Sequence, residues 1–173
     1  PMISKGLLPS WESYRQAYAA PKYYGHGMGW LADVGLEGHL YTDYSLGGFA
    51  GYWLAPRLRT TLNGSLNVPN PVLAAAISPG RLGRGEGDLD FFDFLDEEQV
   101  DVFLGTGLPR VGTPNRPWRY TTGRLEGVDG WIPVFRNVRS AIYLRDDPRN
   151  RVNFEKVASY YRQRGIPFDP KTG

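Results

Sequence analysis

Apolar residues recur at helical spacing in several segments of the chain. In residues 88–99 (DLDFFDFLDEEQ), Leu89, Phe92 and Leu95 are spaced for one helix face, and the acidic residues fall on the opposite side. Residues 147–165 show the same period, with an aspartate and a proline at the start and a glycine at the end. Helices are predicted over residues 10–19, 28–35, 43–55, 70–77, 88–99 and 147–165.

Shorter segments rich in β-branched and aromatic residues are typical of strands. Strands are predicted over residues 39–42, 57–62, 100–104, 118–127, 131–138 and 140–145. The first strands alternate with helices, which favours parallel pairing, whereas the last three follow one another as in an antiparallel meander. The pattern contains no internal repeat. It predicts a single α/β domain over residues 1–173, with three layers, a mixed and partly parallel sheet, and a C-terminal helix.

Glycine and proline residues predict where the elements end. Pro56 ends the helix before it, because the residue preceding a proline avoids helical backbone. Residues 63–64 (Asn-Gly) predict a turn, and the glycine-rich residues 79–87 predict a loop. The glycines within residues 25–29 each cost about 1 kcal/mol relative to alanine in a helix. We therefore expect the helix there to begin only near Met28.

Two groups of residues carry the expected packing. Gly47 and Gly48 lie in the predicted helix 43–55, where glycine permits a close approach to the sheet or, alternatively, to a sugar or phosphate. If packing is the reason, Gly48→Leu should destabilise the domain by overpacking. The expected contact between helix 88–99 and strand 100–104 is made by Phe92, Leu95, Val102 and Leu104.

Composition removes several kinds of site. The chain has no cysteine, which excludes disulfides, thiolate metal sites and cysteine nucleophiles. It has two histidines, His26 and His39, which do not favour a multi-histidine metal centre. The carboxylates between Asp88 and Glu98 are spread along a polar helix face, so solvation explains them. We expect no metal and no cofactor.

Charge argues against a nucleic-acid partner, and hydropathy argues against a membrane-spanning segment in this chain. The net charge is +2, and the basic cluster at residues 145–151 contains Asp146 and Asp147, so a solvated helix start explains it better than a nucleic-acid interface. The longest apolar run, residues 46–54, is far shorter than the roughly 20 residues that span a bilayer. No signal peptide is visible, and the uncapped ends favour a piece of a longer chain.

Candidate ligand-binding residues follow two predicted strands. Asp43 ends one strand and begins a helix, so it can bind a hydroxyl-rich ligand or cap the helix. Gly105, Thr106 and Gly107 follow another strand, where α/β sheets place ligands. Their backbone amides can hold a phosphate with Arg110 as the counter-charge, although neither the dinucleotide fingerprint nor the Walker pattern is present.

Aromatic residues supply a second set of candidates. Trp118, Tyr120, Trp131 and Phe135 can stack on sugars if they are exposed, whereas burial in the core is the alternative. His26, flanked by glycines, has the chemistry of a general base but no evident acid or nucleophile partner. No Ser-His-Asp arrangement can be argued, so no catalytic residue is assigned.

Three segments together resemble the soluble domain of bacterial GT-C-type, polyprenyl-phosphate-sugar-dependent membrane glycosyltransferases. That family carries a strand before an Asn/Asp-aromatic-x-x-Gly-Gly helix, a strand ending in Asp-Gly-Arg, and a Tyr-Gly-Val-Asp-Val strand. The similar segments are residues 39–54 (HLYTDYSLGGFAGYWL), 58–67 (LRTTLNGSLN) and 94–104 (FLDEEQVDVFL). Residues 63–65 (Asn-Gly-Ser) replace Asp-Gly-Arg, so any role of that arginine is absent.

The resemblance implies an extracytoplasmic domain, periplasmic or on the outer face of the inner membrane, joined to a multi-pass enzyme whose catalytic acid lies in the membrane part. The expected function is non-catalytic: recognition of an acceptor, such as a glycan or lipid-linked sugar, or of the membrane portion of the same protein. Two alternatives remain open. One is a free-standing soluble enzyme that binds a phosphorylated or nucleotide-bearing ligand at the Gly105 loop. The other is a protein-interaction module that uses the terminal helix.

Overall fold

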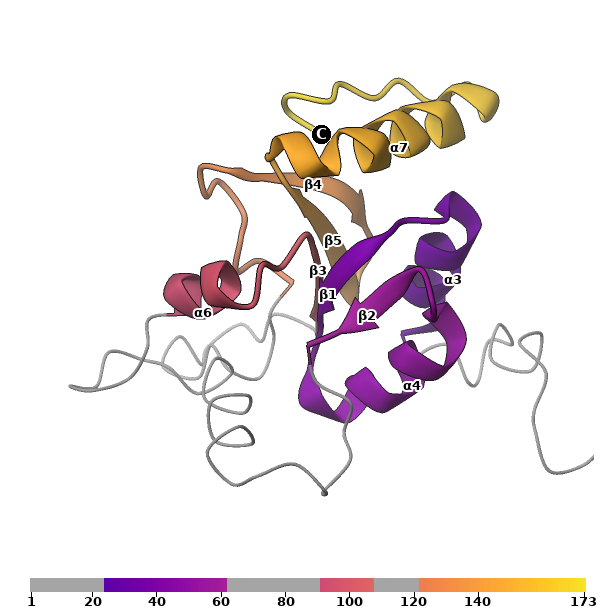
Figure 1. Cartoon of the computed structure of the whole chain (residues 1–173). Helices are drawn as coiled ribbons and strands as arrows, with labels where there is room; N and C mark the ends of the chain where they lie inside the picture. Colours follow the sequence, from indigo (N-terminus) through magenta and orange to yellow (C-terminus); the bar gives the residue numbers. More distant parts are fainter. Residues whose placement is uncertain (1–23, 62–90, 108–121) are drawn as a thin grey trace, which may run out of the picture.

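A computed structural model of the chain describes residues 24–61, 91–107 and 122–173 (Figure 1). In chain order its elements are α3 (Gly25–Val34), β1 (Gly38–Tyr41), α4 (Tyr44–Leu54), β2 (Leu58–Thr60), α6 (Phe91–Glu97), β3 (Val102–Thr106), β4 (Trp131–Arg136), β5 (Ser140–Arg145), η2 (Pro148–Asn150) and α7 (Arg151–Gln163). Four predicted elements lie outside the described residues: the helices over residues 10–19 and 70–77, the turn at residues 63–64 and the loop over residues 79–87.

The five strands form one mixed sheet in the order β2-β1-β3-β5-β4. β1 pairs in parallel with β2 on one side, with Gly38 opposite Leu58, and with β3 on the other, with Tyr41 opposite Phe103. β5 pairs antiparallel with both β3 and β4. The predicted α/β class, with a partly parallel sheet and a C-terminal helix, is confirmed.

Helices cover both faces of this sheet, which gives three layers (Figure 1). Neighbouring residues of a strand point to opposite faces. Leu40 and Val102 therefore enter the core beneath α3, α4 and α7, whereas Tyr41 and Phe103 enter a second core beneath α6. All four side chains are buried. The central strands thus contribute apolar side chains to two cores, as strands of covered α/β sheets do.

α3 begins earlier than the sequence predicts. Its first residues include Gly25, Gly27 and Gly29, all buried. A Cβ atom at Gly27 would lie 2.9 Å from the Ser140 Oγ and 3.3 Å from a methyl group of Leu104. Close packing of the helix on the sheet therefore outweighs the weak helix propensity of glycine.

α4 has the predicted start and end. The Asp43 carboxylate accepts a hydrogen bond of 2.9 Å from the Ser45 N–H, so Asp43 is the N-cap, and the extended Ala55 ends the helix before Pro56. Gly47 is buried, but Gly48 is exposed, so the expected overpacking at Gly48 is wrong. α4 packs on the sheet through another side, which includes Gly51. A Cβ atom added to Gly51 would lie 3.3 Å from the Thr60 hydroxyl of β2.

α6 ends two residues earlier than predicted and is rotated relative to the expected register. Its buried residues are Phe91, Phe94 and Leu95, whereas Phe92 is 41% exposed. The prediction that Phe92 belongs to the core is therefore wrong, and the predictions for Leu95, Val102 and Leu104 are confirmed. The run contains three phenylalanines within four positions, and periodicity alone does not decide which of them faces inward.

The last third of the domain follows the prediction except at residues 122–127. β4, β5 and α7 lie where strands and a helix are expected, and Asp147 caps the 3-10 turn η2 by accepting a hydrogen bond from the Arg149 N–H at 2.8 Å. Residues 122–127 form turns rather than the end of a strand, and Gly127 there has a φ of 69°. β3 is also displaced by two residues, so Gly105 and Thr106 are strand residues and not loop residues.

Candidate ligand-binding groove

The parallel strands bring several predicted residues to one edge of the sheet. β1 and β3 are neighbours and run in the same direction, so Asp43 and the segment Gly105–Gly107 both lie at their carboxyl ends. α4 connects β1 to β2 on one side, while the chain leaving β3 continues to β4 and β5 on the other side. This reversal of strand order is where open α/β sheets bind ligands.

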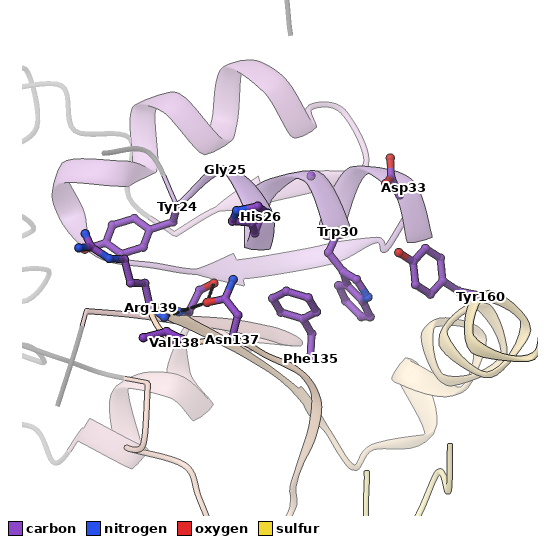
Figure 2. A pocket seen from close by; sticks show the side chains of 12 residues that line it. Tyr24, Gly25, His26, Trp30, Asp33, Phe135, Asn137, Val138, Arg139 and Tyr160 are labelled. Atoms are coloured by element: carbon purple, nitrogen blue, oxygen red, sulfur yellow. Dashed lines mark hydrogen bonds between the residues drawn. The ribbon is translucent and has the colours of Figure 1, made fainter. Parts of the chain in front are cut away.

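A groove of about 790 Å³ lies beside this edge, between α3, the β4–β5 turn and α7 (Figure 2). The first half of α3 forms one wall and the β4–β5 turn faces it. Its lining residues are Tyr24, Gly25, His26, Gly29, Trp30, Asp33, Phe135, Asn137, Val138, Arg139, Ser140 and Tyr160. A volume of this size matches sites that hold small organic ligands.

The helix wall of the groove begins at a strained residue. Tyr24 precedes α3 with a φ of 52° and a ψ of 41°, a left-handed conformation that a tyrosine rarely adopts, and its side chain does not cap the helix. This turn leads directly into Gly25 and His26, and the His26 side chain is exposed (Figure 2). Backbone strain of this kind is concentrated at functional sites.

Aromatic rings form the inner surface of the groove. The Trp30 ring lies 5.3 Å from the Phe135 ring and 5.8 Å from the Tyr160 ring, between centroids. Trp30 itself is only 4% exposed, whereas Phe135 and Tyr160 are partly exposed. The guanidinium of Arg164 lies 3.5 Å from the centroid of the Tyr160 ring. Trp30 is thus the buried support, and the two other rings are the surface that a ligand can reach.

The polar rim is shaped by Asn137 in the β4–β5 turn. Its Oδ1 accepts hydrogen bonds from the Arg139 N–H and the Ser140 N–H, both at 2.8 Å, and from the Ser140 hydroxyl at 3.0 Å. These donors assign the carboxamide orientation, because only the oxygen can accept them. The amide NH₂ of Asn137 therefore has no partner among the described residues. It is a hydrogen-bond donor on the groove lining.

α7 is fixed firmly enough to position Tyr160. The Asn153 side chain exchanges two hydrogen bonds with the backbone of Glu37, of 3.0 and 2.8 Å, and the Lys156 ammonium donates to the Gly35 carbonyl at 2.9 Å. Burial raises the pKa of Tyr161, whose hydroxyl donates to a β4 carbonyl at 2.5 Å. α7 is therefore tied both to the loop after α3 and to the strand that carries Phe135.

The arrangement offers stacking surfaces and hydrogen-bond donors. The Arg139 guanidinium and the His26 imidazole make no ion pair or hydrogen bond with any residue in the described ranges, and both line the groove with Asn137. Asp33 lies on the same lining, toward the far end of α3 (Figure 2). A flat, hydroxyl-rich ligand could stack on Phe135 and accept hydrogen bonds from the rim.

The structure does not bring all the predicted site residues together. Trp131 starts β4 opposite Arg145, at the far end of β3 from Gly107, and is 8% exposed. Its ring packs against Phe103 and lies under the Arg145 guanidinium, 4.7 Å from its centroid. Asp43 uses its carboxylate to cap α4. Arg110 and Trp118 lie outside the described residues.

Sequence reasoning missed most of the groove. Tyr24, Asn137, Arg139 and Tyr160 received no ligand-binding role, although His26 and Phe135 were considered. The Asn-x-x-Ser segment between two strand-like runs was a usable signal, since asparagine often bonds to the backbone of a turn. Nothing in the spacing indicated that α7 would bring Tyr160 beside α3.

Two further findings concern metals and membranes. Within residues 24–61, 91–107 and 122–173, no group of three or more histidine or carboxylate side chains is placed to hold a metal ion. The same part of the chain contains no helix long and apolar enough to cross a membrane. The acidic residues of α6 that the structure describes, such as Asp93 and Asp96, are exposed.

The chain was compared with protein families, with curated proteins and with solved structures. No family model, no curated protein and no solved structure matches the chain. The geometry of the groove and the short motifs of residues 39–104 are therefore the features that bear on function.

Proposed function

We propose that the chain is a non-catalytic accessory domain of a membrane glycosyltransferase-like protein and that its groove binds a saccharide of the acceptor. The observation that carries this proposal is the pairing, in one groove of about 790 Å³, of accessible aromatic rings with donors that have no partner among the described residues. A sugar ring has an apolar face that stacks on aromatic side chains and a rim of hydroxyls that need hydrogen-bond partners.

The direction of the donors supports this ligand class. Asn137 presents an amide NH₂ and Arg139 a guanidinium, so the turn side of the groove donates hydrogen bonds. Phe135 and Tyr160 supply the apolar surface beside it. A phosphate-only ligand would gain from the donors but would leave the rings unused, whereas a saccharide uses both.

The link to a glycosyltransferase rests on the motifs. The segment that resembles the family's helix with a glycine pair is α4, and its cap Asp43 stands at the same edge of the sheet as the groove. In that family the catalytic acid belongs to the membrane part. The proposed role of this domain is therefore to hold an acceptor while the chemistry occurs elsewhere in the same protein.

Binding of oligosaccharides to substituted chains tests the proposal. A panel of neutral and acidic oligosaccharides would be titrated calorimetrically into the chain and into Arg139→Ala and Tyr160→Ala. We expect each substitution to weaken binding about tenfold, equivalent to about 1.4 kcal/mol. Arg162→Ala and Tyr52→Ala are the matched controls, because both residues are exposed and neither lines the groove.

The outcomes separate the proposal from its rivals. Equal affinities for the groove variants and their controls would remove the groove from recognition. Binding of nucleotides or sugar phosphates with no response to any saccharide would favour the phosphorylated-ligand alternative. The full-length gene offers an independent check, since several upstream apolar segments are expected if the domain belongs to a multi-pass protein.

A further inference from the structure

A second hollow, of about 490 Å³, lies at the amino ends of the parallel strands, whereas the groove lies beside their carboxyl ends. It forms where β1 and β2 begin, and its charged or titratable lining residues are Glu37, His39, Arg57, Arg59, Asp101 and Arg149. None of them lines the groove. The hollow is polar where the groove is aromatic, so the two sites suit different ligands.

Strand geometry places three of these side chains in a row. His39 is opposite Arg59 in the register of β1 and β2, so both point to the same side of the sheet. Asp101 directly precedes β3, its N–H donates to the His39 carbonyl at 3.0 Å, and its carboxylate accepts from the His39 N–H at 2.9 Å. Leu58, next to Arg59, is buried on the other side. The row Arg59, His39, Asp101 therefore crosses three strands.

The carboxylates of the hollow already have cationic partners. Glu37 bonds to the Lys156 ammonium, which lowers the pKa of that carboxyl group. Asp101 lies 3.9 Å from a guanidinium nitrogen of Arg149, which also pairs with Asp147 at 3.2 Å. Both carboxylates of the lining therefore have a cationic neighbour, although the Asp101 Oδ1 accepts no hydrogen bond from the described residues.

Two arginines of the hollow are left over. Arg57 and Arg59 are exposed, and neither forms an ion pair or a side-chain hydrogen bond with any residue in the described part of the chain. The guanidinium of Arg57 reaches back to within 3.1 Å of the Cβ position of Gly35, so it stands at the lip nearest to Glu37. Among the described residues named here, the cations are Arg57, Arg59, Arg149 and Lys156, and the carboxylates are Glu37, Asp101 and Asp147. Since Arg149 and Lys156 pair with the carboxylates, the excess positive charge resides on Arg57 and Arg59.

His39 adds a fixed third group. Its Nδ1 lies 3.1 Å from the Glu98 carbonyl oxygen, which can only accept, so Nδ1 carries a proton. The remaining ring nitrogen, Nε2, can then accept a hydrogen bond from a protonated oxygen or, in the imidazolium form, donate to an anionic oxygen. A phosphate monoester can offer both kinds of oxygen, and a phosphate diester offers the anionic kind.

We propose that this hollow is an anion site that takes a phosphate group, mono- or diester, between Arg57, Arg59 and His39. Guanidinium groups match phosphate oxygens with paired N–H donors, which makes arginine the usual residue for such recognition. The phosphate can belong to a small soluble compound or to a lipid headgroup. Both sources present the same chemistry to the arginines, and the experiment below distinguishes them.

The test uses the full chain with glycerol phosphate as the probe and ¹⁵N-detected NMR as the readout. Saturable shifts are expected at Gly38, His39 and Arg59, and Arg59→Gln should weaken binding at least tenfold. Arg162→Gln is the matched control, because Arg162 is an exposed arginine of α7 that lines neither hollow nor groove. Both substitutions are on the surface, and circular dichroism would verify that both variants fold.

A second arm identifies the source of the phosphate. Co-sedimentation with vesicles of phosphatidylglycerol that is lost in Arg59→Gln but kept in Arg162→Gln assigns the site to a lipid headgroup. Saturable glycerol phosphate binding without Arg59-dependent co-sedimentation assigns it to a soluble compound. The proposal is overturned if neither probe depends on Arg59, or if Arg162→Gln weakens binding as much as Arg59→Gln does. Oligosaccharide binding to the groove should be unchanged in either variant.

Discussion

A single asparagine decides the shape of the groove rim. The side-chain oxygen of Asn137 accepts hydrogen bonds from three donors of its own turn, so its amide NH₂ points away from them. The same bonds hold the Ser140 hydroxyl against α3, at the position where Gly27 crosses the sheet. One side chain thereby fixes the turn, the helix contact and a donor on the groove lining.

Tyr41 shows how burial of a single titratable group couples to stability. Burial in the α6 core raises the pKa of Tyr41 to about 12, and the Asp43 carboxylate adds to the rise. A tyrosine in the unfolded chain titrates near 10, so its folded form keeps the proton longer. This residue therefore stabilises the domain fully below pH ~10, and its contribution is lost as the pH rises from about 10 to about 12.

Tyr41→Phe should remove that pH dependence. Relative to the variant, the parent is expected to lose about 2–3 kcal/mol of unfolding free energy between pH ~9 and pH ~12. Urea denaturation at both pH values measures this difference, and Tyr52→Phe, at an exposed position, is the control. A parent and a Tyr41→Phe variant that lose equal stability would show that Tyr41 is not shielded as described.

At the scale of elements, α3 is defined by its closeness to the sheet. The sequence predicts a helix from Met28 because glycine disfavours helices, yet the helix begins at Gly25. Local propensity is worth about 1 kcal/mol per glycine. The contact of Gly27 with Ser140 and Leu104 is a tertiary feature that no local pattern reveals, and it reverses the local preference.

Gly27→Ala should destabilise the domain by about 1–3 kcal/mol through overpacking. The Ser140 hydroxyl, 2.9 Å from the new Cβ, is held by Asn137 and cannot move away easily. Thermal and urea unfolding would measure the loss. Gly123→Ala is the control, because the nearest atom to a Cβ there is 3.7 Å away. A gain in stability for Gly27→Ala, as helix propensity alone predicts, would contradict the close contact.

α6 shows where periodicity reaches its limit. A helix and a following strand were predicted here, with the helix end and the strand displaced by two residues, and Leu95, Val102 and Leu104 are buried as expected. The sequence contains phenylalanines at positions 91, 92 and 94, so several helix faces are apolar. Tyr41 and Phe103 across the interface contact Phe91, whereas Phe92 is 41% exposed.

Phe94→Ala should therefore cost more stability than Phe92→Ala. Phe94 is 5% exposed and meets the Tyr41 ring edge-on at 6.0 Å, so its removal is expected to cost about 3–5 kcal/mol. Phe92 is 41% exposed and should cost clearly less. Chemical denaturation of the two variants compares them directly. The opposite order would mean that α6 is rotated by about 100° from the described register.

At the scale of the molecule, the domain carries two hollows of opposite character on opposite edges of its parallel strands. The α/β class, the mixed sheet and the C-terminal helix could be predicted, because they follow from periodicity and from the order of the elements. The groove could not, because it is assembled from α3, a hairpin turn and α7, which meet only after the sheet has formed. Sites of this kind depend on long-range packing that sequence spacing does not encode.

We propose above that the groove binds a saccharide without transforming it. Residue-resolved NMR of the ¹⁵N-labelled chain during an oligosaccharide titration would detect such binding. We predict saturable shifts at the backbone of His26, the indole of Trp30, the side-chain amide of Asn137 and the backbone of Tyr160, with the saccharide recovered unchanged. Shifts confined to residues away from the groove, or conversion of the saccharide that His26→Ala abolishes, would contradict it.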